Sequence, residues 1–176
     1  ASELCELEAD AYAIGGLAVG EPKSEMLETV EWMDEFLPKN KPRYLMGVGT
    51  PSDLVRNVER GVDMFDCVMP TRNARNGQLF TYDGKINIRN AKYKSDFSPI
   101  DENGFSPMSE IYTKAYLHHL FKTEEILGYR IATQHNLRFY IHLMKTMQNE
   151  IQKGNFGTWA KEFILQYSNE KISILC

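Results

Sequence analysis

The chain has 176 residues, of which 43% are hydrophobic and 25% charged, and its formal net charge is −4. These values are typical of one globular domain, or one domain with an appendage, and they exclude a disordered or fibrous chain. We expect no membrane span, since no uncharged apolar run approaches roughly 18 residues, and no secretory signal at the first residues. The three cysteines, Cys5, Cys67 and Cys176, form no disulfide framework, which favours reduced thiols and a cytoplasmic location.

Residues 11–69 are predicted to alternate between strands and helices. Short β-favouring runs, each ended by Gly or Pro, alternate with segments in which apolar residues recur at helical spacing. The predicted strands are 11–14, 43–48 and 64–69, and the predicted helices between them are 22–37 and 51–60. Strands and helices that alternate with short joints are typical of a parallel α/β fold.

Asp66 lies inside the third predicted strand, between Phe65 and Cys67. An apolar strand in a parallel sheet is buried on both faces, so an acid within it is unusual. Two interpretations are open. Asp66 is either a carboxylate at the end of the strand that accepts backbone hydrogen bonds, or a catalytic group at the edge where α/β active sites are assembled.

The second half of the chain has a different pattern. Residues 78–82 and 85–89 flank Asp83-Gly84, which predicts a β-hairpin with a two-residue turn. Residues 95–109 are predicted to form a loop. The remainder is predicted to be helical, with helices at 111–127 (stopped by Gly128), 133–154 and 159–167.

The charges are distributed unevenly along the chain. Residues 1–35 carry ten acids and one base, whereas residues 71–94 carry six bases and one acid. A basic segment in an acidic protein indicates a surface for a polyanion, or else a solvated face with distant counter-charges.

Six motifs stand out along the chain, of which the most specific is DMFDCVMPTRNARNG at 63–77. The others are GGLAVGE at 15–21, YLMGVG at 44–49, IRNAKY at 88–93, AYLHHL at 115–120 and EILG at 125–128. In their order and spacing, over residues 8–167, these motifs resemble those of bacterial tRNA-guanine transglycosylase.

The resemblance implies the last strands of a TIM (β/α)8 barrel, with an inserted β-hairpin and a C-terminal helical subdomain. Residues 1–77 would be the barrel part and 78–94 the hairpin. Residues 95–170 would be the helical region, which corresponds to the family's zinc subdomain, and 171–176 a tail. A TIM barrel takes about 250 residues, so the chain is expected to be an incomplete barrel, the carboxyl-terminal half of the enzyme.

The activity that the resemblance implies is exchange of guanine at the anticodon wobble position of tRNA for a 7-deazaguanine, the precursor of queuosine. Asp66 matches the family's nucleophile. A carboxylate suits this chemistry, because it can stabilise the positive charge that develops at the ribose anomeric carbon and then bond to that carbon. The exchange needs no metal or organic cofactor. The motifs favour the precursor over finished queuine as the incoming base.

The resemblance also implies the residues that bind substrate. Gly16 and Leu17 match the backbone that bonds the base, and Glu21 matches the carboxylate that supports that backbone. Tyr44 and Met46 match the residues that flank the flat base. The positions that match the two tRNA-contacting stretches are Gly47, Val48, Gly49, Thr50, Pro51, Ser52 and Asp53, and Thr71, Arg72, Asn73, Ala74 and Arg75.

The chain departs from the family at its structural zinc, which is held by a Cys-x-Cys-x-x-Cys run and a later His. Gly104, Ser106 and Ser109 occupy the cysteine positions, and only His135 remains. One His with neutral Ser side chains makes no zinc site of the usual kind, so we expect no zinc there. The loop 99–110 should then be either looser or stabilised by inward packing of Phe105, Pro107 and Met108.

Other departures bear on partners. Thr50 stands where bacterial members often have lysine, which predicts slightly weaker RNA affinity. Family members act as homodimers through the zinc-bearing region, and the loss of the cysteines weakens the case for a homodimer here.

We expect the chain to need tRNA, a 7-deazaguanine base and the missing N-terminal half of the barrel, and to be inactive alone. The alternatives are a truncated, non-catalytic relative that binds RNA or a partner subunit, and a different N-glycosyl hydrolase.

Overall fold

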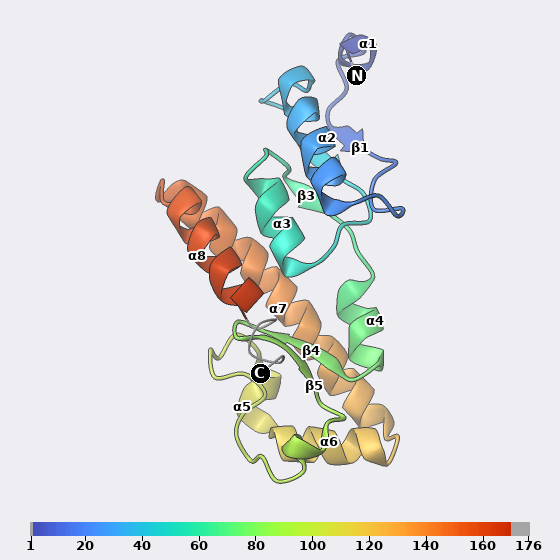
Figure 1. Ribbon diagram of the computed structural model, residues 1–176, viewed down its shortest axis with the longest axis vertical. Helices are drawn as coiled ribbons and strands as arrows, with labels where there is room; N and C mark the ends of the chain where they lie inside the picture. Colours follow the sequence, from blue (N-terminus) through green and yellow to red (C-terminus); the bar gives the residue numbers. More distant parts are fainter. Residues whose placement is uncertain (1, 170–176) are drawn as a thin grey trace. The chain divides into compact units, whose positions relative to one another are not determined.

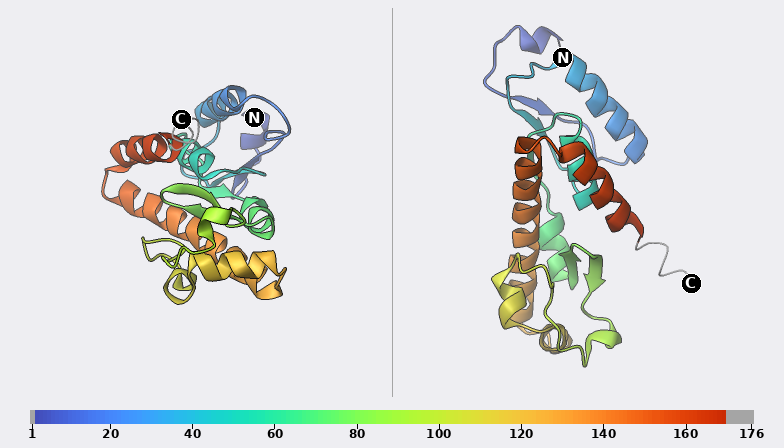
Figure 2. Two further views of the ribbon diagram at one scale, coloured as in Figure 1. Left: turned by 60° about the horizontal axis from the view of Figure 1, so that its bottom comes forward. Right: turned by 90° about the vertical axis from the view of Figure 1, so that its left-hand side faces the viewer.

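The computed structural model describes residues 2–169, and the tail expected at 171–176 lies outside the described residues. The described residues form two compact units (Figures 1 and 2). We call them the sheet unit (residues 2–68 and 155–164) and the helical unit (residues 69–154 and 165–169). Within the described part of the chain, no helix is both long enough and apolar enough to cross a bilayer.

The sheet unit is a three-stranded parallel sheet with a helix in each connection. After a short helix α1 (Ser2–Cys5), its elements are β1 (Tyr12–Ile14), α2 (Lys23–Phe36), β2 (Arg43–Leu45), α3 (Pro51–Val58) and β3 (Met64–Phe65). The strand order is β1-β2-β3, and all pairs are parallel. This arrangement confirms the parallel α/β pattern, in a small sheet that is not closed.

The core of the sheet unit explains why its helices form where they do. Met26 and Val30 lie one helical turn apart on α2, and both are buried against the strands. Connections between parallel strands are right-handed, so α2 and α3 cover the same face of the sheet, and they contact each other (Figure 1). The buried Arg43 is paired with Asp34 and donates to the Leu37 carbonyl at 2.9 Å.

All three predicted strands are shorter than the sequence pattern indicated, the first by a single residue. The chain leaves the sheet after Leu45 because Gly47 takes a φ of 72°, which an extended strand does not allow. The third strand contains only Met64 and Phe65, and the prediction that it is buried on both faces is wrong. Met64 is 43% exposed and Asp66 is also exposed, so no described element covers this face of the sheet at β3.

The helical unit is organised around one long helix. Its elements are α4 (Met69–Arg75), β4 (Gln78–Thr81), β5 (Gly84–Asn87), η1 (Ala91–Tyr93), α5 (Pro107–Ile111), α6 (Lys114–Lys122), α7 (Ile126–Gln152) and the end of α8 (Phe156–Asn169). Helix α7 packs against α4, β4, α5 and α6, and α4 lies beside it in the views of Figures 1 and 2. The antiparallel pair of β4 and β5 is the expected hairpin.

The structure corrects two local predictions at the start of this unit. Pro70 does not end a strand but lies in the first turn of α4, where proline is well tolerated. The hairpin turn is Tyr82-Asp83 rather than Asp83-Gly84, because Thr81 pairs with Gly84. The Thr81 hydroxyl donates to the Gly84 carbonyl at 2.9 Å, and Gly84 has a φ of 104°.

The helix boundaries near Gly128 were also predicted wrongly. Residues 111–127 are not one helix: α6 ends at Lys122, and α7 begins at Ile126 and continues through Gly128. A Cβ on Gly128 would lie 3.0 Å from the Leu120 Cβ. Gly128 therefore permits close packing of α6 and α7, and it is not a stop signal here.

Candidate functional site

The carboxyl ends of the three parallel strands bring two of the predicted site residues, Met46 and Asp66, into one row with Gly15. Ala13 pairs with Tyr44, and Tyr44 pairs with Met64. Two positions further along, just past the ends of the three strands, are Gly15, Met46 and Asp66. In agreement, a Cβ on Gly15 would lie 3.4 Å from the Met46 sulfur.

Asp66 is an exposed carboxylate with two hydrogen-bond donors on one oxygen. The Tyr44 hydroxyl donates to Oδ1 at 2.6 Å, and the Gly47 N–H donates to the same atom at 2.9 Å. The hydrogen bond from Tyr44, followed by that from Gly47, lowers the pKa of Asp66 below its ordinary value. The same contact raises the pKa of Tyr44. The lowered pKa favours the carboxylate anion of Asp66 at the end of the sheet. Both donors bond Oδ1, and neither bonds Oδ2.

Glu21 organises the loop that follows β1. Its carboxylate accepts the N–H groups of Ala18 and Val19, the second at 3.0 Å. These backbone hydrogen bonds, that from Ala18 foremost, lower the pKa of Glu21. Gly16 and Gly20 have φ values of 79° and 132°, which a residue with a side chain adopts at a cost in strain. Glu21 therefore orders the backbone just after Leu17; its supporting role toward a bound base, like base binding by Gly16 and Leu17, stays a prediction.

The stretch after β2 is held by an ion pair that the sequence did not indicate. Thr50 and Asp53 form a capping box at the start of α3, in which each side chain bonds the backbone of the other. The Asp53 carboxylate, only 9% exposed, also accepts the Lys23 ammonium at 2.7 and 2.9 Å. The Thr50 hydroxyl donates a third side-chain hydrogen bond to this carboxylate, at 2.6 Å. Asp53 therefore joins the start of α3 to the start of α2.

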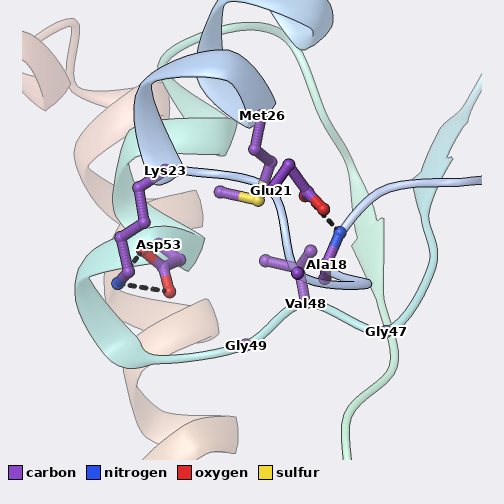
Figure 3. A pocket seen from close by; sticks show the side chains of 9 residues that line it. Ala18, Glu21, Lys23, Met26, Gly47, Val48, Gly49 and Asp53 are labelled. Atoms are coloured by element: carbon purple, nitrogen blue, oxygen red, sulfur yellow. Dashed lines mark hydrogen bonds and ion pairs between the residues drawn. The ribbon is translucent and has the colours of Figure 1, made fainter.

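These contacts surround a cavity of about 200 Å³ in the sheet unit (Figure 3). Lys23 and Asp53 lie on one side of the cavity, and Glu21 with Ala18 lies on the other. The rest of its wall comes from Gly20, Met26, Gly47, Val48 and Gly49. Gly47 belongs both to this cavity and to the contact with Asp66, although Asp66 itself does not line the cavity.

The second predicted tRNA-contacting stretch forms helix α4 in the helical unit. Arg72 and Arg75 are exposed, as a contact with RNA requires. Ala74, however, is fully buried in the core of this unit, so its side chain is not available for RNA. The Asn73 side chain donates to Gln78 Oε1 at 2.7 Å. Contact of these residues with tRNA stays a prediction.

The positions that match the family's zinc ligands do not offer a zinc-binding donor set. Gly104 has no side chain, and the Ser106 hydroxyl caps α5 by accepting the Met108 N–H at 3.3 Å. Ser109 Oγ and His135 Nδ1 are buried without a hydrogen-bond partner among the described residues. Burial lowers the pKa of His135, whose Nε2 donates to the Phe80 carbonyl at 2.8 Å. Within residues 2–169, no three His, Cys, Asp or Glu side chains cluster as metal ligands.

Sequence reasoning missed two functional contacts. Tyr44 was expected only to flank a base, yet its hydroxyl bonds Asp66. The ion pair between Lys23 and Asp53 was not predicted either, although Lys23 follows Pro22 at a predicted helix start. Lys23 also lines the cavity. Neither contact has a local signal, because each joins residues on different elements.

Comparison with known proteins places these motifs in one family. The match to the family described as Queuine tRNA-ribosyltransferase covers residues 1–169. The chain is 55% identical over 166 residues to queuine tRNA-ribosyltransferases of Francisella tularensis subsp. novicida (strain U112) and subsp. tularensis (strain WY96-3418). The matched region is 94% of this chain but 45% of each relative, so the chain spans less than half their length. The chain belongs to the queuine tRNA-ribosyltransferase family.

Proposed function

We propose that the whole protein containing this chain is a tRNA-guanine transglycosylase, which exchanges guanine at the wobble position of tRNA for a 7-deazaguanine precursor of queuosine. Membership of the family supports the reaction class. The observation that carries the assignment to this chain is the Asp66 carboxylate, ionised and oriented by Tyr44 and Gly47 at the end of the sheet.

In the proposed reaction, Asp66 Oδ2 attacks the ribose anomeric carbon as the bond to guanine breaks. Guanine leaves with the bonding electron pair and takes up a proton. The incoming base then attacks the same carbon, releases the Asp66 carboxylate and loses its own proton. Because Oδ1 accepts both hydrogen bonds, it stays fixed while Oδ2 forms and breaks the ester bond. Neither proton transfer is assigned to a residue of this chain.

The test uses the Asp66→Ala variant of the whole protein, with Asp10→Ala as a control that removes an exposed carboxylate from the same unit. Each protein is incubated with tRNA and examined on a denaturing gel for a covalent RNA–protein adduct. We expect an adduct from the parent protein and the control, and none from Asp66→Ala. An equal yield from Asp66→Ala would remove Asp66 from the proposed role.

We also propose that the 176-residue chain supplies the last strands of a TIM barrel and does not catalyse the exchange alone. The open three-stranded sheet and the exposed Met46 and Met64 support this, because an enclosed base site needs walls that these residues do not complete. The chain alone is incubated with tRNA and labelled guanine. Incorporation of label would contradict the proposal. Binding of tRNA without incorporation is expected if Arg72 and Arg75 contact RNA.

A further inference from the structure

Phe105 lies between Gly104 and Ser106, the first two of the three cysteine positions in the run that holds zinc in the family. Its ring contacts three aromatic side chains on one face of α7. The centroid distances are 5.1 Å to His135, 5.5 Å to Phe139 and 5.9 Å to His142. These three residues are spaced four and three apart, which places them in line on a helix. Phe105 therefore attaches the loop before α5 to the long helix.

The hairpin joins the same group of rings. Tyr82 lies 5.9 Å from Phe105 and 5.3 Å from Phe139, and its hydroxyl bonds His142 Nδ1 at 2.6 Å. Phe80 is fully buried and stacks on Phe139 at 6.0 Å. We call this set the aromatic cluster; its members are Phe80, Tyr82, Phe105, His135, Phe139 and His142.

The aromatic cluster joins the same two segments that a metal ion at the matched positions would join. A zinc ion held by residues 104, 106 and 109 and by His135 would fasten this loop to α7, and such an ion contributes folding energy directly. In this chain the donor set does not fit zinc, while Phe105 and the hydrogen bond from His135 to the Phe80 carbonyl connect the loop, the hairpin and α7. Aromatic pairs at these distances are favourable beyond the area that they bury.

We propose that the aromatic cluster around Phe105 replaces the family's zinc centre, so that the fold of the helical unit does not depend on a metal ion. Of the three residues expected to pack inward, Phe105 and Met108 are half-buried, whereas Pro107 is exposed at the start of α5. The linkage therefore depends chiefly on Phe105.

The test measures zinc content and thermal unfolding of the whole protein, purified with zinc in the buffer and then desalted. Zinc is measured by mass spectrometry, and unfolding is followed by circular dichroism with and without a chelator. We expect no stoichiometric zinc and no change in melting temperature with the chelator. Phe105→Ala should lower the melting temperature by about 3–6 °C. The matched control Phe97→Ala, which truncates a ring that is 76% exposed, should leave it nearly unchanged.

The Phe105→Leu variant keeps most of the apolar volume, so its melting temperature should lie between those of the parent and Phe105→Ala. It replaces Phe105→Ala in the test if the alanine variant does not fold. One zinc ion per chain, whose removal lowers the melting temperature, would overturn the proposal. A Phe105→Ala protein that melts like Phe97→Ala would also overturn it. These readouts are independent of base exchange, so they do not depend on the proposed activity.

Discussion

Tyr44 and Asp66 lie 22 positions apart in the chain, yet the tyrosine hydroxyl donates to the aspartate Oδ1 at 2.6 Å. The sheet register explains this contact, since Tyr44 pairs with Met64 and Asp66 follows just past the end of β3. The consequence is an anion that is both oriented and held at a lowered pKa.

Tyr44→Phe should change the pH dependence of adduct formation. Loss of the hydroxyl removes the main cause of the lowered pKa, so the pKa of Asp66 rises and the carboxylate is protonated at higher pH. The acidic limb of the profile should move to higher pH, with a roughly threefold to tenfold lower rate on that limb. The measurement is single-turnover adduct formation as a function of pH.

Tyr116→Phe, which removes an exposed hydroxyl from α6, is the control for Tyr44→Phe and should reproduce the parent profile. A Tyr44→Phe profile that coincides with the parent profile at every pH would show that the hydrogen bond does not tune Asp66.

Glu21→Gln should weaken binding of the free base. The neutral amide accepts with one oxygen only, so the paired N–H groups of Ala18 and Val19 lose one partner and the loop loses its orientation. We expect KM for guanine to rise roughly threefold to tenfold, with a smaller change in kcat. Steady-state exchange of labelled guanine measures both constants. Glu28→Gln, an exposed change on α2, should leave KM unaltered; an equal effect there would contradict this role of Glu21.

Thr50→Lys should have opposite effects on stability and on RNA binding. The lysine cannot accept the Asp53 N–H, so loss of the cap lowers the free energy of unfolding by about 1 kcal/mol. The added charge should steepen the dependence of log affinity for tRNA on log salt by roughly 0.7 for one new phosphate contact. Urea unfolding and filter binding at several salt concentrations measure the two effects.

Thr50→Ala separates these effects, because it removes the cap without adding a charge. It should lower stability by a similar amount while the salt dependence stays that of the parent. If Thr50→Lys binds tRNA with an unchanged salt slope, position 50 does not lie near the RNA backbone.

Asn136→Ala should strongly destabilise the helical unit. The buried Asn136 side chain accepts the Phe80 N–H at 3.0 Å and donates to the carbonyls of Pro70 and Gln78 at 2.9 and 3.0 Å. Truncation leaves these backbone groups without partners, which should lower the free energy of unfolding by roughly 2–4 kcal/mol. Urea denaturation measures the loss, and the exposed Asn149→Ala on the same helix is the control. Equal midpoints for the two variants would be incompatible with this account.

Local patterns predicted some elements well and others poorly. The spacing of Met26 and Val30 correctly indicates α2, and Pro51 correctly marks the start of α3. Gly128 and Pro70 misled the prediction because glycine and proline end a helix or strand in some contexts and lie within a helix in others. A neighbouring helix selects glycine at position 128, and the first turn of α4 accepts proline at position 70.

By itself, the sequence determined the element types of the sheet unit, the hairpin and the family motifs, including the carboxylate of Asp66. These features depend on residues close together in the chain, whose spacing records helical or strand periodicity. Only the tertiary structure decided which distant groups meet: Tyr44 with Asp66, Lys23 with Asp53, and Phe105 with His135. Such pairs are set by strand register and by helix packing, which bring together side chains that have no common local pattern.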